Sequence, residues 1–311
     1  MSKLTTAVIG VGYLGRLHAD KYAALENSKL VAVVDLNAEV AKEIGDKHKV
    51  QALTDYKTLL GKVDAVSIAA PTTLHHNIAR DFLEHGSHVL IEKPIATTVD
   101  EADDLIQLAR SNDLLIQVGH LERFNAAILA LGDTLGRPTF IECHRLAPFS
   151  PRANDVNVVL DLMIHDLDII LDIVDSDIKE MRASGAPVLT PSTDIANARL
   201  EFENGCVANL TASRVSAKTE RKMRIFQDDA YISIDFHNRS LNVCRKGTAE
   251  TRPGIPELVS ERTCPDRNDA LKLEIVAFLD SIQNGTPVIV SGEDGRRALD
   301  AAIRISSLLD E

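Results

Sequence analysis

The sequence contains no tryptophan, only four cysteines and no long apolar segment. The cysteines form no CxxC pair, and neighbouring ones lie at least 20 residues apart: Cys143, Cys206, Cys244 and Cys264. This spacing indicates neither a zinc knuckle nor a disulfide framework, and it favours a reducing compartment. Because every apolar run is short and interrupted by charge, no membrane-spanning helix is expected.

Positive charge is also scarce. The chain has 34 lysines and arginines against 46 aspartates and glutamates, which gives a formal net charge of −12. This excess repels phosphate backbones and anionic lipids, so neither nucleic acid nor a membrane is expected as the main partner. An anionic substrate would need local arginines. The N-terminal residues lead into an expected strand without a signal-peptide core, which favours a cytoplasmic location.

The length of 311 residues predicts two domains. Residues 1–118 alternate short β-branched or apolar runs with helical stretches, as βαβ units with a parallel sheet do. Strands are expected at 6–9, 30–35, 65–69, 88–92 and 114–118, and helices at 13–25, 38–47, 77–85 and 99–110, with Gly45 and Gly86 as C-terminal stops. The fold class is therefore α/β, with a doubly wound N-terminal domain over 1–118.

The pattern changes after Gly119, and residues 119–311 are expected to form a second α/β domain. The expected elements are a helical piece at 122–131, a strand at 139–146, a long helix at 158–174, strands at 195–202, 207–213, 221–226, 231–236 and 240–245, and helices at 269–283 and 293–309. Asn204 and Gly205 lie between two of these strands and predict a hairpin turn.

A glycine-rich loop follows the first expected strand. Gly10-Val11-Gly12-Tyr13-Leu14-Gly15 opens a helix, and Asp35 ends the second strand 20 residues after Gly15. Gly10 permits a tight turn, Gly12 lets the backbone approach a pyrophosphate, and Gly15 lets the helix pack closely on the sheet. Asp35 would bind a ribose 2′-hydroxyl and repel a 2′-phosphate. The motif therefore predicts an NAD site and disfavours NADP.

Two further strand ends point to the same edge of the sheet, where ligands collect. Pro71, Thr72 and His75 follow the strand at 65–69, and they are expected to line the cofactor. Glu92 and Lys93 end the strand at 88–92, which places the Lys93 ammonium beside the nicotinamide half. Lys93 there could carry a proton or donate to a substrate hydroxyl. A surface lysine and a solvated histidine are the alternatives.

A polar stripe interrupts the apolar helix at 158–174. Asp161, His165, Asp168 and Asp172 recur at helical spacing and share one face. Asp161 and His165 lie one turn apart, so the carboxylate can orient the imidazole and raise its basicity. This pair predicts a general base for a hydroxyl proton. An acidic solvent face is the alternative, and a metal site is disfavoured because no further ligand has suitable spacing.

Three arginines precede this helix in the sequence: Arg123, Arg145 and Arg152. Their guanidinium groups could clamp a diphosphate or a carboxylate through forked hydrogen bonds. Each could equally be ordinary surface charge.

Taken together, these segments resemble the Gfo/Idh/MocA family, which includes glucose-fructose oxidoreductase and inositol dehydrogenase. The resemblance rests on the glycine-rich loop with Asp35, the segment 71–75, Glu92-Lys93-Pro94, the segment 118–125, and Asp161-xxx-His165 with Asp168. It implies a Rossmann domain, and then an α/β domain whose open, mostly antiparallel sheet serves homodimer or homotetramer contacts. It also implies that Lys93, Asp161 and His165 are the catalytic residues.

Within the family, residues 144–152 and 158–166 resemble the members that act on UDP-sugars. This implies NAD-dependent oxidation of the C3 hydroxyl of UDP-N-acetylglucosamine to a 3-keto sugar, which an aminotransferase would use in lipid A synthesis. The arginines, Asp161 and His165 would then bind the substrate. Two alternatives are a dehydrogenase of a free sugar or cyclitol, and a non-catalytic dinucleotide-sensing regulator.

Overall fold

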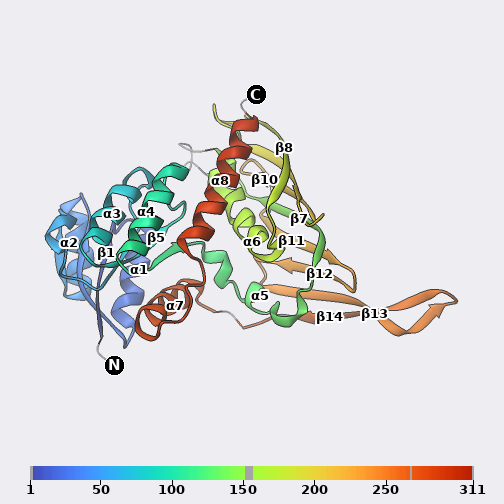
Figure 1. Ribbon diagram of the computed structural model, residues 1–311, viewed down its shortest axis with the longest axis horizontal. Coiled ribbons are helices and arrows are strands. Elements are labelled where there is room, and N and C mark those ends of the chain that lie inside the picture. The colour runs from blue at the N-terminus through green and yellow to red at the C-terminus, as the bar shows by residue number, and fades with distance from the viewer. Residues whose placement is uncertain (1–2, 151–156, 267, 310–311) are drawn as a thin grey trace. The chain divides into compact units, whose positions relative to one another are not determined.

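A computed structural model describes residues 3–150, 157–266 and 268–309 (Figure 1). It divides the chain into two compact units. The first consists of Met1–Leu121 and Asp269–Leu299, and the second of Glu122–Asn268 and Asp300–Glu311. The sequence-based division assigned everything after 118 to the second domain, whereas 269–299 lies in the first unit. No helix in the described ranges is long and apolar enough to span a bilayer.

The first unit contains a six-stranded parallel sheet in the order β3-β2-β1-β4-β5-β6. Its strands are β1 (Leu4–Ile9), β2 (Ser28–Val34), β3 (Gln51–Leu53), β4 (Ala65–Ile68), β5 (His88–Glu92) and β6 (Ile116–Gly119). The order reverses between β1 and β4, which creates the switch point where ligands bind in such sheets. The predicted doubly wound topology is confirmed, and only the short β3 was missed.

Helices connect these strands: α1 (Tyr13–Ala24), α2 (Ala38–His48), α3 (His75–Glu84) and α4 (Val99–Ser111), with the 3-10 helices η1 (Tyr56–Leu59) and η2 (Thr72–Leu74). The Thr98 side chain and Glu101 form a capping box that starts α4. Gly45 lies inside α2, so its predicted role as a stop was wrong. Instead Lys49, in the left-handed conformation, ends that helix.

The helix α7 (Ala270–Asn284) packs into the core of the first unit. Its buried side chains Ile275 and Phe278 share one cluster with Val8 of β1 and Tyr22 of α1. The apolar face of α7 therefore explains why 269–299 returns to this unit. The following helix α8 (Gly292–Leu309) contributes residues to both units.

The second unit contains an eight-stranded sheet in the order β14-β13-β12-β11-β7-β10-β9-β8. Its strands are β7 (Pro138–Leu146), β8 (Ile178–Ala186), β9 (Ile195–Phe202), β10 (Val207–Ser213), β11 (Glu220–Gln227), β12 (Ala230–Asp235), β13 (Ser240–Arg252) and β14 (Ile255–Thr263). Every neighbouring pair is antiparallel except β7 with β10. The expected second α/β domain is confirmed.

The remaining elements of the second unit lie before β7 and between β7 and β8: η3 (Leu121–Phe124), α5 (Ala126–Leu129), η4 (Gly132–Thr134), the π-helix η6 (Val159–Met163) and α6 (Ile164–Val174). Gly205, at φ +87°, makes the predicted hairpin turn between β9 and β10. Beyond Arg245, β13 pairs only with β14, and this hairpin extends past the rest of the sheet (Figure 1). The strands β8 and β14 were not predicted.

Candidate active site

The glycine-rich loop has the geometry of a phosphate cradle. Gly10 has φ +82°, and a Cβ there would lie 2.8 Å from the Ala69 carbonyl oxygen, so only glycine fits the turn. A Cβ at Gly15 would collide with the Gly10 carbonyl oxygen, because α1 starts directly against the loop. At Gly12, by contrast, no atom lies within 4 Å of the Cβ position. The open space lies where the motif predicts close approach of a pyrophosphate.

The N-terminus of α1 is free to receive an anion. Gly12 precedes the helix without a side-chain cap, and no acidic residue lies in the first turn. The partial positive charge of the helix end is therefore not offset by an acidic residue in the helix's own first turn. Tyr13 and Leu14 are 70% and 42% exposed, so they present apolar surface beside the loop. These features fit a dinucleotide.

Asp35 follows β2 and is held by the backbone. Its Oδ2 accepts from the Val11 amide at 3.0 Å, and its Oδ1 accepts from the Asn37 amide at 2.9 Å. The carboxylate is thus fixed beside the glycine-rich loop. The next two residues, Leu36 and Asn37, are exposed and uncharged. Nothing at this turn offers a cation for a 2′-phosphate, in agreement with the predicted choice of NAD.

His75 is buried instead of lining a surface. It is 1% exposed, with Nδ1 2.9 Å from the Pro94 carbonyl oxygen and Nε2 2.8 Å from the Ala70 carbonyl oxygen. Burial lowers its pKa, although both carbonyl groups oppose the shift. The ring ties the loop after β4 to the loop after β5. The predicted contact of His75 with the cofactor stays a prediction, as do those of half-buried Thr72 and exposed Pro71.

Glu92 and Lys93 end β5, as predicted. Glu92 Oε1 lies 3.0 Å from Nε2 of His18, a fully buried side chain of α1. Burial raises the pKa of Glu92, but His18 and Lys93 outweigh burial and lower it overall. His18 was missed by the sequence analysis. Its spacing of three residues from Gly15, which places both on the buried face of α1, is the signal that could have identified it.

Asp161 and His165 lie on two kinds of helix. Asp161 belongs to the π-helix η6, whereas His165 is in the first turn of α6. Asn157 starts this segment, because its Oδ1 accepts from the Val159 and Leu160 amides. Both candidate side chains are half-buried. A π-turn is wider than an α-turn, so the regular stripe predicted for one continuous α-helix was wrong.

The C-terminal half of the stripe pairs with Arg123. Arg123 Nε lies 3.4 Å from Asp168 Oδ2, and Arg123 Nη1 contacts Asp172 Oδ2. Arg123 and Asp168 are 6% and 2% exposed, whereas the Asp172 side chain is 49% exposed. The guanidinium of Arg123 therefore binds carboxylates of its own unit, and its predicted contact with a ligand stays a prediction.

The guanidinium of Arg145 binds two carboxylates through three hydrogen bonds. Its Nε and Nη2 donate to the two oxygens of Asp166 at 2.9 and 2.7 Å, and Nη1 donates to Glu122 at 3.0 Å. The guanidinium also lies 5.7 Å from the ring centre of Phe236. Burial alone would lower the pKa of Arg145, but Asp166 and Glu122 raise it. Arg145 is thus part of a buried ion pair, and its predicted contact with a ligand stays a prediction. Arg152 lies outside the described residues.

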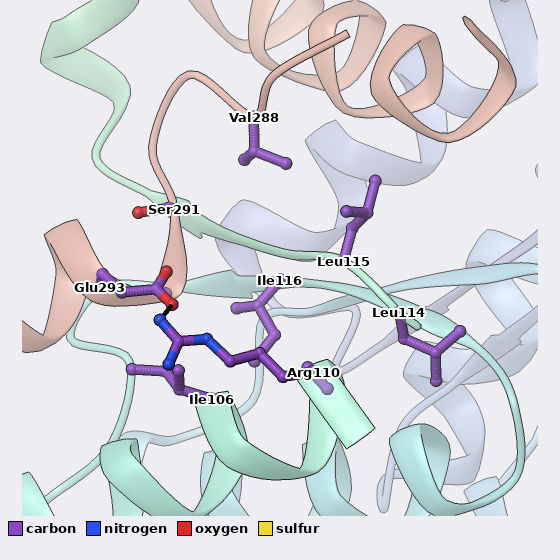
Figure 2. Close-up of a pocket in the computed structure, with 10 residues that line it drawn as sticks. Ile106, Arg110, Leu114, Leu115, Ile116, Val288, Ser291 and Glu293 are labelled. Carbon is purple, nitrogen blue, oxygen red and sulfur yellow. Dashed lines mark hydrogen bonds and ion pairs between the residues drawn. The ribbon is translucent and has the colours of Figure 1, made fainter. Parts of the chain in front are cut away.

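One cavity of about 200 Å³ lies apart from these residues, within the first unit. Figure 2 shows Arg110 and Glu293 paired at its edge, with Ile106 and Ile116 among its aliphatic lining. None of the predicted site residues lines it. Among the described residues, no group of three or more His, Cys, Asp or Glu side chains could hold a metal ion. The candidate residues therefore lie at the strand ends of the first unit and, separately, on the η6–α6 segment of the second.

Comparison with known proteins identifies the family of this chain. Residues 4–120 match the oxidoreductase family described as having an NAD-binding Rossmann fold, and residues 129–233 match the Gfo/Idh/MocA C-terminal domain. The chain belongs to the Gfo/Idh/MocA family. As a member of this family it is an NAD-binding oxidoreductase, which confirms the predicted cofactor and enzyme class.

Relatives within the Gfo/Idh/MocA family cover almost the whole chain. UDP-N-acetylglucosamine 3-dehydrogenase of Acidithiobacillus ferrooxidans is 44% identical over 98% of this chain and 97% of its own. A solved structure of that protein has a TM-score of 0.94, covering 100% of this chain and 98% of the other. Myo-inositol 2-dehydrogenase of Thermotoga maritima is 24% identical over 94% of this chain and 92% of its own.

Proposed function

We propose that this protein oxidises the C3 hydroxyl of UDP-N-acetylglucosamine with NAD and forms a 3-keto sugar. The observation that carries the proposal is the 44% identity, over nearly the full length, to a relative named for this reaction. The site agrees with it, because a dinucleotide cradle, a strand-end lysine and an aspartate-histidine segment are all present.

The glycine-rich loop and Asp35 would hold NAD, which supplies a hydride acceptor when bound. Gly12 leaves room for the pyrophosphate, and the N-terminus of α1 stabilises its charge. Asp35, already oriented by two amides, accepts from the ribose hydroxyls. Thr72 and Pro71 border the cofactor at the neighbouring strand end.

His165 accepts the proton of the C3 hydroxyl as the carbon-bound hydrogen leaves. Asp161 orients the imidazole and stabilises the imidazolium that forms. Lys93 donates to the same oxygen and opposes the negative charge that develops there. This division of roles requires a neutral His165 and a protonated Lys93 in the reactive state, which gives the rate a dependence on pH at both ends of the range.

We propose that groups other than Arg123 and Arg145 bind the diphosphate. Arg123 and Arg145 already bind buried carboxylates, so they fix η3, β7 and α6 relative to one another within the second unit. Arg152 remains a sequence-based candidate for the diphosphate. We further propose a cytoplasmic homodimer or homotetramer whose product, a ketone, is consumed by an aminotransferase.

The test is to follow absorbance of reduced nicotinamide after mixing the purified protein with NAD and one substrate, with the ketone trapped chemically. The panel contains UDP-N-acetylglucosamine, UDP-glucose, N-acetylglucosamine, glucose and myo-inositol. Reduction with UDP-N-acetylglucosamine alone supports the proposal. Reduction with myo-inositol alone would replace it with a cyclitol dehydrogenase, the second candidate, which the 24% identity to such an enzyme favours. Silence despite NAD binding would favour a dinucleotide-sensing regulator.

A further inference from the structure

Glu274 of α7 is a buried acid outside the proposed catalytic set. Its side chain is 0% exposed, and neither carboxyl oxygen has a hydrogen-bond partner among the described residues. A carboxylate in such a place would lose its hydration without replacement, which is costly for an ion. Glu274 is therefore either ionised, with a large loss of folding free energy, or neutral.

The surroundings of Glu274 contain no described cation that could offset a negative charge at its oxygens. From β6, the Gln117 amide Nε2 donates to the Glu274 backbone oxygen at 2.9 Å, and Gln117 Oε1 has no described partner either. From α1, Tyr22 is fully buried with its hydroxyl 2.9 Å from Ser67 Oγ. Lys21 of α1 lies 2.5 Å from Asp269, the residue directly before α7, and already pairs with its carboxylate.

Glu92 of β5 is the acid whose charge acts on Glu274. Its environment differs, because Glu92 Oε1 lies 3.0 Å from His18 Nε2 and Oε2 accepts from the Lys93 amide at 3.3 Å. Two carboxyls that interact in a buried place titrate as a pair, and the better-solvated member keeps the charge. Burial and the charge of Glu92 both raise the pKa of Glu274, whereas the pKa of Glu92 is lowered overall, since His18 and Lys93 outweigh burial.

We propose that Glu274 and Glu92 share one proton held on Glu274, so that Glu92 is the ionised member of the pair beside Lys93 and acts as its positioning residue. Glu92 precedes Lys93 in the chain, and the lysine charge is among those that stabilise the Glu92 carboxylate. The attraction is mutual, so Glu92 favours the ammonium form of Lys93. A second charge at Glu274 would change that balance.

The protonation of Glu274 is tested by stability, without any assay of activity. A carboxyl that is neutral when folded and ionised when unfolded weakens folding progressively as pH rises above the unfolded value of about 4.3. Glu274→Gln removes this linkage. Between pH 5 and 7, the unfolding equilibrium constant of the wild type should rise relative to that of the variant by about tenfold per pH unit. Urea unfolding followed by circular dichroism measures this ratio.

Glu43→Gln is the matched control, because Glu43 is an exposed glutamate on α2 of the same unit. Its unfolding constant should keep a fixed ratio to the wild type across the same range. A fixed ratio for Glu274→Gln as well would mean that Glu274 is ionised in the folded protein, and the proposal would be overturned.

The link to Lys93 rests on the proposed function and is tested by the pH profile of kcat. Glu274→Gln replaces a neutral carboxyl by a neutral amide, so the alkaline limb should stay within about 0.3 pH units of the wild type. The double variant Glu92→Gln/Glu274→Gln also removes the Glu92 carboxylate, and its alkaline limb should move about one unit to lower pH. NAD binding confirms that each variant is folded.

A shift in Glu274→Gln as large as in the double variant would overturn the assignment of the charge to Glu92. An unshifted double variant would overturn the role of Glu92 beside Lys93. If the wild type oxidises none of the sugars, the proposed function fails, but the stability comparison still reports on the proton of Glu274.

Discussion

Arg145 and Asp166 form a forked ion pair inside the second unit. Two nitrogens of the guanidinium donate to the two carboxylate oxygens at 2.9 and 2.7 Å, and both side chains are less than 5% exposed. Arg145 lies on β7 and Asp166 on α6, so the pair fastens the helix that carries His165 to the middle of its sheet. Arg145, which the sequence predicts to bind a ligand, thus supports the segment that we propose to be catalytic.

Removing one member of this pair should destabilise the protein strongly. Arg145→Ala leaves Asp166 and Glu122 buried beside each other without their cation, for which about 3–5 kcal/mol is expected. The double variant Arg145→Met/Asp166→Leu should lose less than Arg145→Ala, because Asp166 no longer remains as a buried unpaired charge and Arg221 Nη1 still lies 3.6 Å from Glu122. Urea unfolding measures both. Arg182→Ala, at an exposed pair with Glu180, is the control and should change stability by less than about 0.5 kcal/mol.

The glycines of the loop should respond differently to alanine. Gly12→Ala adds a methyl group that meets no protein atom within 4 Å, so the protein should fold while its affinity for NAD falls by about tenfold or more. Gly15→Ala drives a methyl group into the Gly10 carbonyl and should prevent correct folding of α1 on the sheet. Thermal unfolding and titration with NAD separate the two effects. Unchanged NAD affinity in folded Gly12→Ala would contradict the proposed cradle.

The proposed proton path predicts losses in turnover without loss of cofactor. His165→Ala and Lys93→Ala should each lower kcat by about 10²-fold or more, since each removes a proton-transferring or charge-stabilising group. NAD affinity should stay within a few-fold. Asp161→Asn should lower kcat less than His165→Ala, because it weakens the orientation of a base that is still present. An unchanged kcat in any of the three variants removes that residue from the mechanism.

The parts of the fold that sequence predicted well are those in which residue type fixes local geometry. Gly10 and Gly15 allow backbone approaches that a side chain would block, and β5 is an apolar run buried on both faces. The strand β14 gave no such signal, since each of its residues is exposed and no buried face imposes an alternation. Its pairing with β13 is formed by the backbone ladder and by side-chain hydrogen bonds such as that of Ser260 to Asn242 Oδ1 at 2.8 Å.

The elements that carry the candidate site residues were predicted in outline, but the side-chain partners of these residues were not. The residue types at 158–174 fit a regular α-helix, and none of them indicates the π-turn that contains Asp161. An arginine pattern likewise does not tell whether a guanidinium will meet a ligand or a carboxylate of its own unit, as Arg145 does. The apolar pattern of α7 indicated a helix, but its place beside β1 arises from packing over 250 residues of sequence separation.

A buried aspartate outside the site should make stability depend on acid pH. Asp194 is 0% exposed, and its Oδ2 accepts from the amides of Val188, Leu189 and Thr190 at 2.6–2.9 Å. Its Oδ1 accepts from Arg214 Nε at 2.8 Å. Burial alone would raise the pKa of Asp194, but these donors outweigh burial and lower it well below its usual value.

Because the folded pKa lies below the unfolded value of about 3.9, the ionised Asp194 stabilises the folded state above that pH. This contribution is lost as pH falls toward the folded pKa. Asp194→Asn should therefore be clearly less stable than the wild type at pH 7, and the difference should shrink as pH falls below about 4. Asp228→Asn, an exposed aspartate between β11 and β12, should track the wild type throughout. A gap for Asp194→Asn that stays constant from pH 7 to 3 would show that its carboxylate is not held in this way.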